Sequence, residues 1–317
     1  GEMEVTYRRK SIPLEPVEGE TCADLFTRIA GLVHLKQKRL RLTYMVEAEA
    51  EAKAEVKEVQ EVSADQEQER ETQTKPKKMV LKANTDLVKD TLKDVPTLMA
   101  KDMGPQIDYQ TVFIIEYAGP LFIWFLCMLG FHGPSFDNMS TQQLMGSAMF
   151  IFHYIKREME TLFVHTFSHP TMPVRNVFKN SIYYWGWALL MAYHIMDKEY
   201  TPVSTDLQFH AGVALFFMAE FGNLYCHIKL RLLRSGGKTG YQLPTGFLFN
   251  SIICPNYTTE LLAWVGFNIA TQCLWGWLFL LCGFVQIYAW AVKKQARLVK
   301  MFPETKSRAL LFVSRYF

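Results

Sequence analysis

The chain has 317 residues, of which 50% are hydrophobic and 21% are charged, and its formal net charge is +3. That length suits about two domains, and the nearly balanced charge gives no indication of a nucleic-acid partner. The average conceals two unlike parts, because residues 1–110 are polar and charged whereas residues 111–292 are mostly apolar and aromatic. This division excludes a single soluble globule and indicates a soluble head followed by a membrane domain.

The six cysteines form no CxxC pair, and five of them lie in or beside the apolar part of the chain. Structural zinc sites and disulfide frameworks use closely spaced cysteines. We therefore expect neither a disulfide framework nor a metal site.

The first fifty residues carry the pattern of a small α+β domain. Residues 3–9 and 12–17 predict two strands of a hairpin. Residues 21–35 carry apolar side chains at helical spacing and predict a helix capped by Thr21. Residues 40–46 return to strand character. This order of elements resembles that of a ubiquitin-like β-grasp domain.

An acidic segment interrupts the head. Residues 47–71 contain ten acidic side chains against three basic ones and no aromatic residue. Such a composition buries too little apolar surface to order a chain and favours disorder over a solvated helix. We expect a disordered insertion at 47–78 in a head that spans residues 1–104. The head shows no catalytic constellation, which favours a docking or folding module.

The remainder, residues 105–317, is organised by apolar stretches. They cover residues 111–131, 142–155, 177–195, 207–228 and 257–292. A helix that crosses the bilayer needs about 20 mostly apolar residues. The second stretch is short, and residues 158–164 extend it. The last has 36 residues, which predicts two helices joined by a tight turn near residues 272–276.

Basic residues alternate between the connections. Three connections contain almost no lysine or arginine: there is none in segments 132–141 and 272–276, and there is one in segment 197–206. The other connections are basic, with four such residues in each of segments 156–180 and 229–256 and seven in the tail after Val292. By the positive-inside rule, the head, the two basic connections and the tail are cytosolic. Both ends on one side require an even number of spans. We therefore predict an all-α polytopic membrane bundle of six transmembrane helices behind the α+β head.

Ionisable and amide side chains inside apolar spans are costly and typical of functional sites. Those of interest are Glu116, His153, Tyr154, Glu220, Asn223, His227, Asn256 and Glu260. The spacing of Glu220, Asn223 and His227 places them on one helical face. The alternative for each residue is a hydrogen bond between neighbouring helices. Because these residues gather toward the cytosolic ends, we expect one polar cavity that faces the cytosol.

Several stretches carry a family resemblance when they are taken together. They are EYAGPL at 116–121, FHYIKREMETLFVHTFSHPTMP at 152–173, NLYCHIKLRLLRSGGKTGYQLPTG at 223–246 and CPNYTTELLAW at 254–264. Together they resemble the very-long-chain trans-2-enoyl-CoA reductases of the endoplasmic reticulum, in the steroid 5α-reductase superfamily. The resemblance covers about residues 105–303, and the family's ubiquitin-like head matches residues 3–98 more loosely. The run KREMETLFVH is specific to the enoyl-CoA branch.

The resemblance implies NADPH-dependent reduction of a long-chain trans-2-enoyl-CoA to a saturated acyl-CoA, the last step of the fatty-acid elongation cycle. The protein would work beside other elongation enzymes in the endoplasmic reticulum membrane, with both termini and the active site in the cytosol. Tyr257 and Lys156 match the essential tyrosine and lysine of the enoyl-CoA branch, and Glu116 and Tyr154 match the substrate-polarising pair of the steroid branch. The implied cofactor-binding residues, with Lys238 added as a phosphate partner, are Asn223, Arg234, Lys238, Tyr241, Asn256, Glu260, His165 and His169.

The tail departs from the family. Where relatives have His-Arg-x-Tyr, this chain has Gln295-Ala296-Arg297-Leu298, and Leu298 supplies no phenol. No GxGxxG fingerprint follows a strand, so the cofactor is not expected on a Rossmann fold. Three other functions stay open at this point. They are a reductase of a steroid enone or polyprenol, a membrane methyltransferase that uses S-adenosylmethionine, and a non-catalytic scaffold of the elongation complex.

Overall fold

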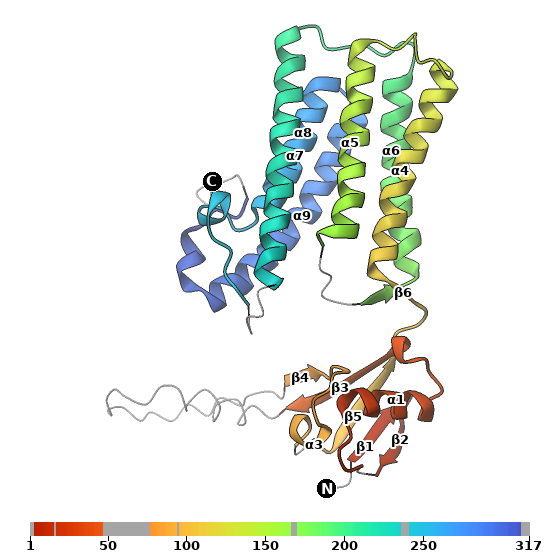
Figure 1. The fold of residues 1–317 in the computed structure, drawn as a ribbon, viewed down its shortest axis with the longest axis vertical. Coiled ribbons are helices and arrows are strands. Elements are labelled where there is room, and N and C mark those ends of the chain that lie inside the picture. Colours follow the sequence, from red (N-terminus) through yellow and green to blue (C-terminus); the bar gives the residue numbers. More distant parts are fainter. Residues whose placement is uncertain are drawn as a thin grey trace. The chain divides into compact units, whose positions relative to one another are not determined.

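The computed structural model describes residues 3–15, 17–46, 77–93, 95–165, 170–235 and 241–311. The chain divides into two compact units, Gly1–Gln106 and Ile107–Phe317, and each is described by itself (Figure 1). The predicted site residues His169 and Lys238 lie outside the described residues, as does the predicted insertion from residue 47 to residue 76.

The head is a five-stranded mixed sheet that packs against a helix. Its strands are β1 (Met3–Tyr7), β2 (Lys10–Leu14), β3 (Leu40–Val46), β4 (Lys77–Val80) and β5 (Thr97–Asp102). Their order is β2-β1-β5-β3-β4. Strands β1 and β5 run parallel, with Val5 opposite Leu98, and the other neighbours are antiparallel. The predicted order of strand, strand, helix and strand is confirmed.

Helix α1 (Cys22–Leu32) begins where its cap predicts. The Thr21 hydroxyl accepts from the Asp24 amide at 3.2 Å, and the Asp24 carboxylate accepts from the Thr21 amide at 3.2 Å, which makes a capping box. The helix ends at Leu32, earlier than predicted, and His34 takes a left-handed φ of 52°. Residues 77–78, which the sequence places in the insertion, begin β4 instead. A short helix, α3 (Val88–Thr91), precedes β5.

An ion pair joins the residue before β3 to the last residue of β5. The Arg39 guanidinium lies 2.6 Å from one Asp102 oxygen and donates to the other at 3.0 Å. Asp102 also accepts from the amide of Gly104 at 2.8 Å. These hydrogen bonds, with that of Arg39 the larger, hold the pKa of Asp102 below its ordinary value. The pair fixes the start of β3 beside the end of β5.

The described residues of the second unit form a bundle with six long helices. They are α4 (Tyr109–His132), α5 (Thr141–Phe163), α6 (Arg175–Met196), α7 (Asp206–Ser235), α8 (Pro255–Thr271) and α9 (Leu274–Met301). Each predicted apolar stretch forms a helix, the second with its predicted extension. The predicted tight turn lies at Gln272, whose φ of 49° is left-handed. A two-stranded sheet of β6 (Gln106–Asp108) and β7 (Thr171–Pro173) lies at one end of the bundle (Figure 1).

Three of the described helices are long and apolar enough to cross a membrane, namely α4, α7 and α9. Helix α8 has only 17 residues. Helix α5 carries Lys156, Arg157, Glu158 and Glu160 close together in its second half. The membrane character of the unit is therefore supported by three helices, and the six-span count stays a prediction.

Helices α7 and α8 touch backbone to backbone through two glycines. A Cβ atom on Gly212 would lie 2.6 Å from the nitrogen of Ala270, and one on Gly266 would lie 2.5 Å from the nitrogen of Phe216. No side chain fits in either place. This close approach brings the polar residues of α7 and α8 within hydrogen-bonding distance of each other.

Candidate active site

Polar side chains from α5, α7 and α8 meet inside the bundle. Their spacing of three and four residues puts them on one face of each helix: His153, Lys156 and Glu160 on α5, Glu220, Asn223 and His227 on α7, and Asn256, Thr259 and Glu260 on α8. Most are buried. The expected polar cluster is therefore present, as a network of buried side chains in direct contact.

Lys156 lies at the centre of this network with 7% of its surface exposed. Its Nζ is 2.7 Å from Oε2 of Glu220 and donates to Oδ1 of Asn223 at 2.5 Å. A second carboxylate, that of Glu160, is 3.6 Å away. A buried ammonium is tolerated only when opposite charge and acceptors surround it. Lys156 is therefore held in place rather than extended toward water.

Asn223 uses both ends of its amide. Its Oδ1 accepts from Lys156, and its Nδ2 donates to the backbone carbonyl of Asn256 at 2.8 Å and to Oγ1 of Thr259 at 3.4 Å. The Asn256 side chain keeps a buried oxygen, Oδ1, without a hydrogen-bond partner among the described residues. A buried acceptor in that state suits a polar ligand.

His153 continues the network from α5 toward α8. Its Nδ1 lies 2.6 Å from Oε1 of Glu220, and its Nε2 lies 3.6 Å from Oε1 of Glu260. The imidazole ring also packs edge-on against Trp264, with centroids 4.8 Å apart. Glu220 thus contacts Lys156 with one oxygen and His153 with the other.

Arg157 forms a second group with Glu160 and Tyr117. Its guanidinium donates to Oε2 of Glu160 at 2.7 Å and to the Tyr117 hydroxyl at 2.9 Å. The guanidinium also lies 5.1 Å from the centroid of the Tyr117 ring, a cation–π distance. The cations Lys156 and Arg157 are thus balanced by the carboxylates Glu160 and Glu220.

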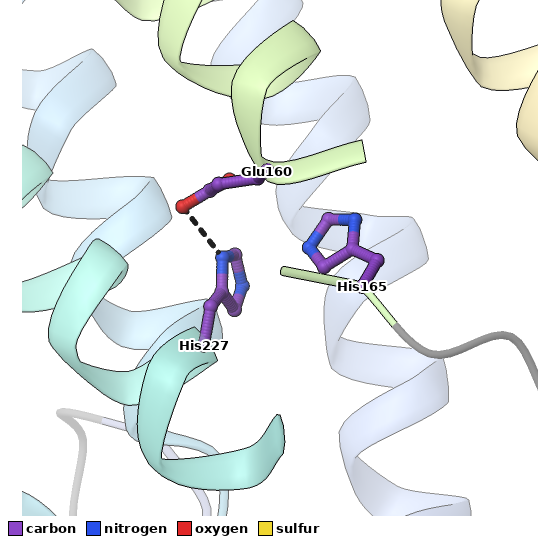
Figure 2. A group of neighbouring side chains, drawn as sticks. All are labelled: Glu160, His165 and His227. Carbon is purple, nitrogen blue, oxygen red and sulfur yellow. Dashed lines mark ion pairs between the residues drawn. The ribbon is translucent and has the colours of Figure 1, made fainter. Parts of the chain in front are cut away.

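Glu160, His165 and His227 have the residue types of a metal site (Figure 2). Their potential ligand atoms lie within 4.8 Å of one another. The Glu160 carboxylate, however, already contacts Arg157 at 2.7 Å, His227 at 2.9 Å and Lys156 at 3.6 Å. Two cations next to the only carboxylate of the group oppose a third positive charge. We therefore assign the group to the ion-pair network.

His165 lies just beyond the end of α5, where its amide donates to the Glu160 carbonyl at 2.7 Å. Its ring packs edge-on against that of His227, with centroids 5.0 Å apart. Burial, with the positive charge of Arg157 and then His227, lowers the pKa of His165 to about 3. The ring is therefore neutral at physiological pH.

The predicted substrate pair lies between α4, α5 and α6. Glu116 is buried on α4 and accepts a hydrogen bond from the amide of Asn180 on α6. Tyr154 is buried on α5 among aromatic rings, with centroids 4.7 Å from Phe150 and 6.2 Å from Tyr117. Tyr117 joins this aromatic group to Arg157 and hence to the polar network.

Two predicted tyrosines each lie beside a cation from α9. The Tyr257 ring is 5.8 Å from Nζ of Lys294, and the Tyr241 ring is 5.1 Å from the guanidinium of Arg297. Tyr257 is half-buried, and Tyr241 is exposed. Leu298, at the position of the missing tail phenol, is buried. Helix α9 therefore offers cations rather than a phenol to these two tyrosines.

Arg234 lies in the last turn of α7 with an exposed side chain. The structure thus brings together Lys156, Asn223, Asn256 and Glu260 from the sequence prediction, and it leaves Arg234 and Tyr241 at the periphery. It also adds Glu220 and His153, which the sequence placed in the expected polar cavity without a specific role, and Arg157 and Glu160, which it did not single out. Their signal was present in the sequence, in the Glu220–Asn223 and Lys156–Glu160 spacings on shared helical faces.

Comparison with known proteins places this arrangement in a family. A family model described as 3-oxo-5-alpha-steroid 4-dehydrogenase matches residues 170–313. A very-long-chain enoyl-CoA reductase of Dictyostelium discoideum is 43% identical over 237 residues, which cover 73% of this chain and 78% of that protein. The chain belongs to the very-long-chain enoyl-CoA reductase family. A human protein named trans-2,3-enoyl-CoA reductase-like is 32% identical over 221 residues, 66% of this chain and 61% of that protein.

The predicted resemblance is therefore confirmed, and the chain is an oxidoreductase of this family. The matched family model includes Asn223, Asn256, Tyr257 and Glu260. Lys156 and Glu116 lie before residue 170, outside the part shared with the steroid enzymes' model. In this enoyl-CoA reductase, the network around Lys156 thus joins residues from inside and outside the matched region.

Proposed function

We propose that the protein reduces long-chain trans-2-enoyl-CoA to saturated acyl-CoA with NADPH, as the last step of fatty-acid elongation. The names of its relatives support the reaction, and a nicotinamide cofactor accords with the family model. The observation that carries the proposal is the buried contact from Lys156 through Asn223 to Asn256, the residue next to Tyr257. It links Lys156 to the first turn of α8, the helix that carries Tyr257, and so supports a joint role for these two residues.

The residues fit the chemistry of this reduction. NADPH supplies a hydride when it is bound, and hydride addition to the β-carbon leaves negative charge on the thioester oxygen. A hydroxyl or ammonium donor directed at that oxygen stabilises this charge. We assign Tyr257 and Lys156 to charge stabilisation and to delivery of the proton to the α-carbon. Glu116 and Tyr154 are proposed to orient the substrate.

The residues present also fit a nicotinamide dinucleotide. The unpaired oxygen of Asn256, with Asn223 and Glu260 nearby, suits an amide or a ribose hydroxyl. Arg234 and Lys238 suit phosphate groups, and the exposed Tyr241 ring offers a stacking face. His165 and His169 belong to the connection after α5 and complete the proposed set.

The test is oxidation of NADPH by detergent-purified protein, with a long trans-2-enoyl-CoA and a 3-oxo-4-ene steroid measured side by side. Turnover of the enoyl-CoA with little turnover of the steroid supports the proposal. The reverse preference favours a steroid reductase, the activity that the description of the matched family model names. Absence of NADPH oxidation with both substrates refutes the proposed NADPH-dependent reduction.

We further propose six membrane spans, with the head, the tail and the site on the cytosolic side of the endoplasmic reticulum and other elongation enzymes as neighbours. The alternation of basic and neutral connections supports this topology. A tag placed after Phe317 should be digested when protease is added outside sealed microsomes. Protection of the tag contradicts the topology without affecting the proposed reaction.

The head, residues 1–104, is proposed to be a ubiquitin-like β-grasp module, and residues 105–317 the reductase. The parallel pairing of β1 and β5 at the centre of the sheet supports this fold. The location of the polar network within the second unit supports this division of roles. A chain that starts at residue 105 should therefore keep its kcat if it folds in detergent.

A further inference from the structure

Glu220 is among the most buried carboxylates of the described bundle, with 1% of its surface exposed. It lies on α7, and both of its oxygens contact side chains of α5. Oε2 is 2.7 Å from Nζ of Lys156, and Oε1 is 2.6 Å from Nδ1 of His153. A carboxylate removed from water is stabilised by close partners of this kind, an ammonium for one oxygen and a hydrogen-bonding imidazole for the other.

The contact with Glu220 fixes the tautomer of His153. An ionised carboxylate only accepts hydrogen bonds, so the hydrogen of the imidazole lies on Nδ1. The other nitrogen, Nε2, faces Glu260, whose nearest oxygen is 3.6 Å away. Glu260 is half-buried, with 22% of its side chain exposed, so this nitrogen faces the more open side of the network.

The same carboxylate fixes the direction of the Lys156 ammonium. The ammonium is held between Glu220 on one side and the Asn223 oxygen on the other, at 2.7 and 2.5 Å. Without Glu220, Glu160 would be the nearest carboxylate, and it is 3.6 Å away and engaged with Arg157 and His227. Loss of the Glu220 charge would therefore release Lys156 from its present position.

We propose that Glu220 is a positioning residue of the reductase site, which aims Lys156 and sets the tautomer of His153 with its two oxygens. The inference rests on the proposed function for its activity readout. The alternative is that Glu220 only ties α5 to α7. Such a tie affects stability, whereas a positioning residue affects kcat in protein that is fully folded.

Glu220→Gln tests the proposal because it keeps the size of the side chain and removes its charge. Its amide can still accept from Lys156, but its NH2 group then faces Nδ1 of His153 and requires the opposite tautomer. At a temperature well below unfolding, kcat should fall by at least about tenfold, as expected for displaced catalytic groups. The KM for NADPH should change by less than about twofold, because no phosphate partner is altered.

Glu199→Gln is the control, because it makes the same chemical change away from the network. Glu199 lies in the connection between α6 and α7, and its side chain is exposed. Its kcat should equal that of the wild type. Wild-type kcat in folded Glu220→Gln protein overturns the proposal and leaves only the helix tie.

A second readout requires no substrate. The rate at which acetic anhydride modifies Lys156, followed by mass spectrometry, should rise at least about fivefold in Glu220→Gln, because the ion pair that holds the amine inside the buried network is gone. It should not change in Glu199→Gln. If the wild type does not reduce enoyl-CoA, the proposed function fails while this readout still decides the effect on Lys156. An unchanged rate overturns the proposal.

Glu220→Asp carries the test if Glu220→Gln does not fold. Aspartate keeps the charge but is one carbon shorter, so it cannot maintain both contacts to α5. Its kcat should fall at least about fivefold, and wild-type kcat would overturn the proposal.

His153→Asn separates the effect of His153 from that of Lys156, the other side chain that Glu220 contacts. The amide of the new asparagine can still donate to Glu220, but the nitrogen Nε2 is lost. The proposal expects a lower kcat here without faster modification of Lys156, and wild-type kcat contradicts the role of the tautomer.

Discussion

The side-chain nitrogen of Asn223 donates to the backbone carbonyl of Asn256 at 2.8 Å and thereby ties α7 to the first turn of α8. The oxygen of the same amide receives the Lys156 ammonium. An aspartate in this place would lack the donor, and an alanine would lack both groups. The Asn223 amide thus links the position of Lys156 to the start of α8.

Tyr257→Phe removes one hydroxyl from the residue that follows Asn256. If that hydroxyl donates to the thioester oxygen or the α-carbon, kcat should fall by about 10²-fold or more. NADPH affinity should be kept, because the ring beside Lys294 remains. Steady-state kinetics and NADPH fluorescence titration on purified protein measure the two effects. Tyr288→Phe, on an exposed part of α9, is the control, and near-normal turnover of Tyr257→Phe would transfer the donor role to Tyr154.

Arg234→Ala tests the choice between the two nicotinamide cofactors. NADPH differs from NADH by one phosphate, and a charged hydrogen bond is worth about 1.5–3 kcal/mol, or roughly tenfold and more. The KM for NADPH should rise by that factor while the KM for NADH changes little. Lys300→Ala, an exposed position near the end of α9, should alter neither. Equal increases for both cofactors would remove Arg234 from phosphate recognition.

Gly266→Ala should destabilise the bundle, because the new Cβ would lie 2.5 Å from the Phe216 nitrogen on α7. Overpacking against backbone costs about 1–3 kcal/mol. Gly283→Ala on α9 is the control, since nothing lies within 4 Å of its Cβ position. Thermal unfolding of both variants in the same detergent measures the difference. Equal unfolding midpoints for the two variants would mean that α7 and α8 can move apart without loss of stability.

Acid should weaken the protection of the head's sheet against hydrogen exchange, because Asp102 becomes protonated. Its pKa in the folded protein lies below the ordinary value because of Arg39, so the stabilisation is present above about pH 4. It is lost as the pH falls through the folded-state pKa. Hydrogen exchange of β5 in the full chain, corrected for intrinsic rates, should show this loss. Asp102→Asn should be less protected at neutral pH and should change less in acid, whereas exposed Glu18→Gln should behave as the wild type.

Local signals in the sequence predicted local structure well. Thr21 and Asp24 have the spacing of a capping box, and α1 begins there. The six helices of the bundle follow from apolar stretches, because the length of an apolar run in the sequence indicates the length of its helix. Strand β5 was not predicted, since its residues, TLMAKD, lack strict alternation and pair with strands distant in the chain. Its pairing depends on tertiary contacts.

The site was predictable by face but not by partner. Glu220, Asn223 and His227 share a helical face by spacing alone. The sequence does not define the rotation of α5 about its axis, and that rotation decides whether Glu220 meets Lys156. The rotation depends on contacts spread over α5 and the helices that pack against it. The charged pair at the centre of the site is therefore a property of the assembled bundle.

The parallel pairing of β1 with β5 has a consequence for the order of folding. Val5 lies opposite Leu98, so the central pair of the head joins segments from the two ends of that unit. A growing chain can form the β1–β2 hairpin early, but β1 keeps an unpaired edge until residues 97–99 have been made. The entropy of closing such a loop grows only with the logarithm of its length. A long connection between β3 and β4 therefore costs this sheet little in stability, although it delays the synthesis of the residues that cover the exposed edge of β1.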